Sequence, residues 1–252
     1  PLHADLLAGA LAHGLFDEIT GLDDEDIKKG LTELEKQLSA LPHPLAKAKA
    51  VGYVLQNTRI DVNEHDYFVA LYSLNRLPGA VTHNKWSSEV FSALSDTYST
   101  MCKMCGSGAA VIWPDFDHVV PDWDAVLNLG FPGLLKRCEQ YRKNREENGL
   151  LDKKTAAFFD GMILSYQAIL ALIDRLYRYA KTKAHEKAEK IAACLLHIRD
   201  GAPQNTYEAM QVIFLYFLIS ECFDAYQVRS LGNGLDSTLW RFYQNDIKTG
   251  VY

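Results

Sequence analysis

The stretch that decides the fold covers residues 117–133 and reads DHVVPDWDAVLNLGFPG. Within it and just beyond, Val126, Leu127 and Leu134 are spaced to share one helical face, which predicts a helix over residues 122–147. Gly130 and Gly133 interrupt this pattern and predict a bend or a close approach of two backbones, rather than flexibility.

Helical periodicity also dominates the chain on both sides of this stretch. An early helix is predicted from one apolar face, with Asp23 or Asp24 as its cap. That face consists of Ile27, Leu31, Leu34 and Leu38. Further helices are predicted over residues 45–57, 64–75, 86–105, 152–199 (one helix or a pair), 205–223 and 235–246. Asn205 is placed as a helix cap, with Glu208 three positions on.

Two short apolar stretches predict strands, at residues 109–113 and 226–231. Glycine-containing turns lie beside both of them. No internal repeat, linker or low-complexity tract divides residues 1–252, so no domain boundary is predicted. Periodicity alone therefore predicts one mainly helical globular unit with one or two short strands.

Composition restricts the classes of function. With 252 residues and 48% hydrophobic content the chain can bury a substantial core. A net charge of −6 without a basic stripe argues against nucleic acid as a partner. The longest strongly apolar stretch, residues 212–220, is far shorter than the roughly 20 residues that cross a bilayer, so no membrane contact is expected. Five cysteines without a secretory signal favour the reducing cytoplasm.

Common catalytic and metal-binding motifs are missing from the sequence. There is no G-x-S-x-G, P-loop, G-x-G-x-x-G or H-E-x-x-H pattern. Cys102 and Cys105 have metal-like spacing, but a tetrahedral site needs about four ligands and no second pair stands at a matching interval. We therefore expect two free thiols near a helix end and no metal.

The deciding stretch resembles the G-H-x-x-P-D-Y-x-x-V-L-x-x-G-x-x-G signature of glycyl radical enzymes, the pyruvate formate-lyase and diol dehydratase family. It keeps the histidine, the Pro-Asp pair, an aromatic residue, Val-Leu and both glycines. Asp117 stands where the family has glycine, a residue that adopts positive φ more readily than aspartate.

Two further regions carry the resemblance in the same order. Residues 47–66 are similar to a family segment in which a helix leads through a short acidic entry into an apolar stretch. The other region resembles the family's R-Y-A, P-A-x-T-F-x-E-A-x-Q and G-R-x-D-Q-x-x-x-P-F-Y-x-x-D elements. Its parts are residues 178–180, 202–211, and 234–236 with 242–246. The arginine of G-R-x-D is missing, and residues 229–234 hold one extra residue.

The resemblance implies a mainly α fold with a few short parallel strands, forming the N-terminal half of a glycyl-radical-enzyme-type α/β barrel over residues 1–252. In the family a glycyl radical near the C-terminus passes to a cysteine, and the thiyl removes a hydrogen atom from a small molecule. Neither a Gly-Cys-Val-Glu-like nor an Arg-Val-x-Gly-Tyr-like segment is present here. The catalytic Cys loop and glycyl radical domain are thus absent, and this chain alone is expected to be inactive.

The resemblance also places four candidate substrate-binding residues. His118 stands where some diol-dehydratase-like members hold a substrate hydroxyl; its imidazole would donate a hydrogen bond or a proton, although a helix-entry role is the alternative. Ser230 lies near a family serine that contacts substrate, with an ordinary strand-end serine as the alternative. Asp236 matches the family aspartate and serves either the pocket or a helix cap, the cap being favoured. Arg229 would bind a substrate carboxylate or lie on the surface.

Cofactors and partners follow from the resemblance. No bound cofactor is expected; the glycyl radical would be installed by an activating enzyme with an iron–sulfur cluster and S-adenosylmethionine. The expected partners are a small-molecule substrate, this activating enzyme and a second copy in a homodimer, in an anaerobic cytoplasm. The complete enzyme would be a lyase or a formate C-acetyltransferase-like transferase. The alternatives are a non-catalytic helical binding or assembly module of the same origin, and an unrelated helical protein.

Overall fold

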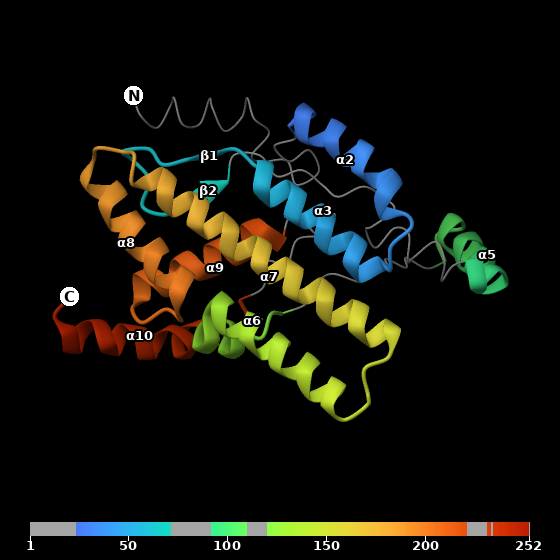
Figure 1. The fold of residues 1–252 in the computed structure, drawn as a ribbon. Coiled ribbons are helices and arrows are strands. Elements are labelled where there is room, and N and C mark those ends of the chain that lie inside the picture. The colour runs from blue at the N-terminus through green and yellow to red at the C-terminus, as the bar shows by residue number, and fades with distance from the viewer. Residues whose placement is uncertain (1–23, 72–91, 110–119, 221–230, 233, 252) are drawn as a thin grey trace.

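The computed structural model describes residues 24–71, 92–109, 120–220, 231–232 and 234–251 (Figure 1). In chain order the described elements are α2 (Glu25–Leu38), α3 (His43–Asn57), β1 (Ile60–Asp61), β2 (Ala70–Leu71), α5 (Ser95–Gly106), α6 (Trp123–Glu147), α7 (Lys153–Ala180), α8 (Glu186–Asp200), α9 (Thr206–Ser220) and α10 (Leu235–Thr249). The prediction of a mainly helical protein is confirmed.

The residues just before α2 and α3 explain where these two helices begin. The Asp24 carboxylate accepts hydrogen bonds from the N–H groups of Asp26 and Ile27, which caps α2 as predicted. Helix α3 begins at His43, slightly earlier than predicted, because Pro42 occupies its cap and Pro44 is tolerated in its first turn.

Helix α7 is the centre of the core. It packs against α3, α6 and α8, and Figure 1 shows it running diagonally between α3 and α6. Ile173 and Leu176 on its buried face have no exposed surface. Arg175 on α7 donates to the backbone carbonyls of Gln56 and Thr58, which satisfies orphan groups at the C-terminal end of α3.

By length and composition α7 is long and apolar enough to cross a bilayer. The longest strongly apolar stretch of the sequence, residues 212–220, lies in α9 instead. In the structure α7 packs against α3, α6 and α8, and 28% of its 18-residue apolar window is buried.

Two predicted helices contain the breaks that their sequences indicate. Gly130 has φ 61° and ψ 175° and interrupts α6 at the predicted bend. The predicted helical region 152–199 is a pair, α7 and α8, with His185 as the cap of α8: its Nδ1 accepts from the Ala188 N–H at 3.1 Å.

The described strands differ from the prediction. The helix predicted over residues 64–75 is wrong over 64–71, because β2 pairs there with β1 in an antiparallel register. The strand predicted at 109–113 lies outside the described residues except for Ala109, a bend, and that at 226–231 except for Leu231. The described pair is therefore not the parallel set implied by the resemblance, and the described residues do not form a barrel.

Candidate functional site

Three of the four predicted substrate-binding residues, His118, Arg229 and Ser230, lie outside the described residues. Asp236 is described and stands exposed in the first turn of α10. Gly234 occupies the cap position of this helix, where no side chain makes a capping hydrogen bond. Asp236 therefore lies two residues inside α10 and is not its N-cap.

The other residues that carried the family resemblance do come together. Asp61 belongs to residues 47–66, one of the regions similar to the family. Its carboxylate accepts a hydrogen bond of 2.9 Å from the hydroxyl of Tyr179 in the R-Y-A element. Lys183 Nζ lies 3.1 Å from the same Asp61 oxygen. Burial alone would raise the pKa of Asp61, but hydrogen bonds from the Val62 N–H, Tyr179 and Lys183 outweigh burial and hold the pKa below its usual value. This cluster ties β1 to the C-terminal end of α7.

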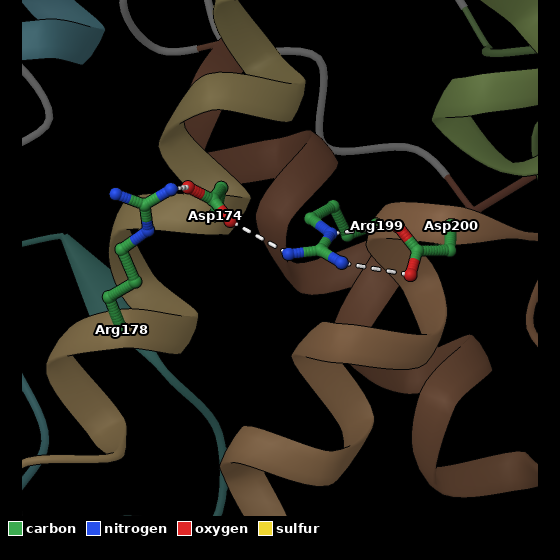
Figure 2. A network of polar contacts seen from close by, with 4 residues as sticks. All are labelled: Asp174, Arg178, Arg199 and Asp200. Atoms are coloured by element: carbon green, nitrogen blue, oxygen red, sulfur yellow. Dashed lines mark hydrogen bonds and ion pairs between the residues drawn. The ribbon is translucent and has the colours of Figure 1, made fainter.

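Arg178, the first residue of the R-Y-A element, belongs to a second polar network (Figure 2). Asp174 lies 2.8 Å from both Arg178 and Arg199, and Arg199 also binds Asp200 through two nitrogen–oxygen pairs. Hydrogen bonds from Arg199 lower the pKa of Asp200. The alternating charges join α7 to the last turn of α8, so this network serves helix packing.

A third cluster lies at the start of α9. Asn205 Oδ1 accepts from the Glu208 N–H at 2.9 Å, and Glu208 Oε2 accepts from the Gln204 N–H at 2.8 Å. This is the predicted cap, shifted so that the glutamate binds the residue before Asn205. His197 Nδ1 on α8 lies 2.7 Å from Glu208 Oε2, without hydrogen-bond alignment.

The same helix is anchored at two more points. Gln211 has no exposed surface, and its Oε1 accepts from the Val69 N–H at 2.9 Å just before β2. The carboxylate of Asp246 on α10 accepts from the Thr206 N–H at 3.0 Å. These bonds reach 142 and 40 residues along the chain, and no local sequence pattern reveals such partners.

The described part of the deciding stretch contacts the loop between α8 and α9. Asp122 caps α6 by accepting from the Ala125 N–H at 3.0 Å, and Trp123 is buried. A β-carbon on Gly130 would lie 2.7 Å from the carbonyl oxygen of Gly201 and 2.9 Å from Cα of Ala202. The glycine is thus required where α6 touches the loop between α8 and α9.

An open groove of about 640 Å³ lies between α2, α3 and α7. Its polar lining residues are Lys49, Tyr53, Gln56, Gln167 and Arg175, and Arg175 is bound to the carbonyls of Gln56 and Thr58. Asp236, the one predicted site residue that the structure describes, does not line it. Among the described residues no three His, Cys, Asp or Glu side chains are grouped to hold a metal ion; Cys102 and Cys105 are free thiols.

Comparison with known families finds a match to "Pyruvate formate lyase-like" proteins over residues 82–252, more than half of the chain. The chain belongs to this family. A comparison with curated proteins finds no match.

The fold of this pyruvate formate lyase-like chain is similar to that of solved glycyl radical enzymes. A glycyl radical enzyme from Archaeoglobus fulgidus matches 91% of the chain with a TM-score of 0.68 and 19% identity. The hydroxyproline dehydratase of Clostridioides difficile matches 88% with a TM-score of 0.62 and 19% identity, and the B12-independent glycerol dehydratase of Clostridium butyricum matches 85% with a TM-score of 0.58 and 17% identity. The matched regions make up 36%, 34% and 34% of those chains, so this chain spans about a third of their length.

The family residues in the described part thus act mainly as structural contacts between distant segments. The unrelated helical protein is excluded by the family match and by the shared fold. Sequence reasoning missed the roles of Asp61, His197 and Asp246, because each role depends on a partner brought close only by folding.

Proposed function

We propose that this chain forms the N-terminal part of a glycyl radical enzyme that removes water from, or otherwise cleaves, a small hydroxylated substrate. The observation that carries the proposal is the match of 85–91% of the chain to a glycyl radical enzyme and two dehydratases. A non-catalytic module of the same origin is not favoured, because the matched structures named as dehydratases are enzymes.

The chain would supply scaffold and part of the substrate pocket. The glycyl radical, installed by an activating enzyme with an iron–sulfur cluster and S-adenosylmethionine, would supply hydrogen-atom removal from the substrate through a cysteine. Because this sequence contains no Gly-Cys-Val-Glu-like or Arg-Val-x-Gly-Tyr-like segment, the cysteine and the glycine would come from further polypeptide.

Three residues of this chain are proposed to act on the substrate. His118 would donate a hydrogen bond, and then a proton, to the hydroxyl that leaves as water. Ser230 would hold a second hydroxyl, and Arg229 would bind a carboxylate where the substrate has one. Water loss from a 1,2-diol gives a carbonyl product and water, so no external oxidant or reductant is consumed.

The test is made on the complete gene product. The gene is sequenced beyond the codon for Tyr252, and the full protein is incubated anaerobically with its activating enzyme and S-adenosylmethionine. We expect a glycyl radical signal by electron paramagnetic resonance and water loss from glycerol or trans-4-hydroxy-L-proline.

The 252-residue chain under the same treatment is the control, and we expect no glycyl signal from it. In the complete protein, His118→Ala should keep the radical signal and lose most of the turnover. A full-length protein that forms no glycyl radical would refute the proposed function. An active protein that cleaves a substrate without water loss would retain the radical-enzyme assignment and exclude the dehydratase one.

A further inference from the structure

The groove between α2, α3 and α7 combines an apolar lining with positive charge. Its volume of about 640 Å³ lies within the roughly 300–1,000 Å³ of small-molecule sites. Helix α3 packs against both α2 and α7, and Figure 1 shows it between them. Most of the lining side chains are apolar or small, among them Leu34, Gly52, Leu164, Ala168 and Leu172. Such a surface suits the aliphatic part of a ligand.

Helices α3 and α7 run in the same direction along this groove. Near the start of α3, a β-carbon on Gly161 of α7 would lie 2.6 Å from the carbonyl oxygen of Pro44. Near the end of α3, Arg175 of α7 donates to the carbonyl of Gln56. The lining follows α3 over residues 48–56. The groove is therefore elongated, with its long axis along both helices.

The wall formed by α2 is held in place by Tyr53. The Tyr53 hydroxyl lies so close to the α2 backbone that a β-carbon on Gly30 would stand 1.8 Å from its oxygen. Tyr53 itself lines the groove. Contact of this kind fixes the distance between α2 and α3, so the groove is formed before any ligand arrives.

The two cationic side chains that line the groove stand toward its two ends. Arg175 lies beside Gln56, and Lys49 precedes Gln56 by seven residues on α3. At about 1.5 Å per residue this interval is about 10 Å along the helix. Among the described residues that line the groove there is no aspartate or glutamate. A chain with a net charge of −6 thus holds a groove whose charged lining is entirely positive.

Neither cation is paired with an acidic side chain in the described part of the protein. Arg175 donates to the neutral backbone carbonyls of Gln56 and Thr58, and its Nε is buried without a hydrogen bond. Burial lowers the pKa of Arg175, and no carboxylate offsets this effect. Lys49 is exposed and makes no ion pair with a described residue. The charge that both side chains lack is that of a carboxylate, which arginine binds well.

We propose that this groove binds an elongated small molecule that has an aliphatic chain and a carboxylate at each end. The apolar lining covers the chain, while Arg175 and Lys49 each pair with one carboxylate. Arg175 uses the N–H groups that remain beyond those bound to the α3 end. Extended nonanedioate has a length comparable to the separation of the two cations. The site goes beyond the proposed function and does not rest on it.

The test titrates nonanedioate into the complete gene product, without activation, by isothermal titration calorimetry. We expect a dissociation constant of about 1 mM or below, as for good ligands of this size. Nonanoate has one carboxylate, and butanedioate is too short to reach both cations. Each should bind at least about threefold more weakly. An absence of nonanedioate binding, or equal affinity for nonanoate, would overturn the proposal.

Three variants locate the binding. Ala171 is exposed and lines the groove, so Ala171→Trp fills the groove without removing charge and should weaken binding at least about tenfold. Lys49→Gln should weaken nonanedioate about threefold and leave nonanoate unchanged. Lys36→Gln, at an exposed position of α2 outside the lining, is the control and should change neither. Urea unfolding confirms that each variant is folded.

The outcome is separable from that of the proposed function. Binding that persists in Ala171→Trp would place nonanedioate elsewhere and refute the inference, whether or not the protein forms a glycyl radical. Binding of nonanedioate that Lys49→Gln leaves unchanged would also refute it. A protein that loses binding in Ala171→Trp and Lys49→Gln but forms no radical keeps this inference and loses the proposed function.

Discussion

Gly130 is the residue at which sequence and structure agree most directly. The sequence predicts a bend there, and the structure gives φ 61° and ψ 175°, a region essentially restricted to glycine. The backbone of the loop between α8 and α9 also lies against the position that a β-carbon would take. The residue is thus required both for its conformation and for its small size.

We expect Gly130→Ala to lower the free energy of unfolding by at least about 3 kcal/mol, since it adds strain and a backbone clash. The control is Gly149→Ala, at φ 67° with no atom within 4 Å of a new β-carbon. It should cost only about 1 kcal/mol, because the clash is absent. Urea unfolding of both variants measures the difference, and equal losses would show that the contact with Gly201 is not limiting.

At the scale of elements, the start of α9 shows which contacts a sequence can reveal. The cap by Asn205 and Glu208 is local and is predicted. The bond from the Thr206 N–H to Asp246 joins two helices and is not predictable from spacing. The helix predicted over residues 64–75 fails for the same reason, since Val69 is bound by Gln211 of α9 and β2 pairs with β1.

We expect Asp246→Ala to loosen α10 and the first turn of α9. The variant leaves the Thr206 N–H without its acceptor in a partly buried position, which costs about 1 kcal/mol. Amide hydrogen exchange in α10 and at Thr206 should become faster. Gln244→Ala, at an exposed position on the same helix, is the control and should leave exchange unchanged. Unchanged exchange in Asp246→Ala would show that apolar packing alone holds α10.

At the scale of the whole molecule, Asp61 links the N-terminal helices and strands to α7 through Tyr179 and Lys183. Because its folded pKa lies below the usual value of 3.8, the unfolded chain takes up a proton first as the solution is acidified. The stability that Asp61 contributes is complete well above pH 3.8 and is lost as the pH falls through the folded value.

We therefore expect Asp61→Asn to lower the free energy of unfolding by about 1 kcal/mol at neutral pH. The difference from the unsubstituted protein should shrink as the pH falls below about 5. Glu33→Gln, at an exposed position on α2, is the matched control and should show no such convergence. Urea titrations at a series of pH values measure it, and a difference independent of pH would assign the loss to packing instead of charge.

The sequence by itself determined the mainly helical class, the bend at Gly130, the caps at Asp24 and Asn205, and the family resemblance. These features depend on residues within a few positions of one another, or on motifs read along the chain. Only the tertiary structure decided the antiparallel pairing of β1 with β2, the central place of α7, and the bonds made by Asp61, Gln211 and Asp246. Those features join segments far apart in sequence, and the free energy that selects them comes from burial and hydrogen bonding between the segments, which no local pattern records.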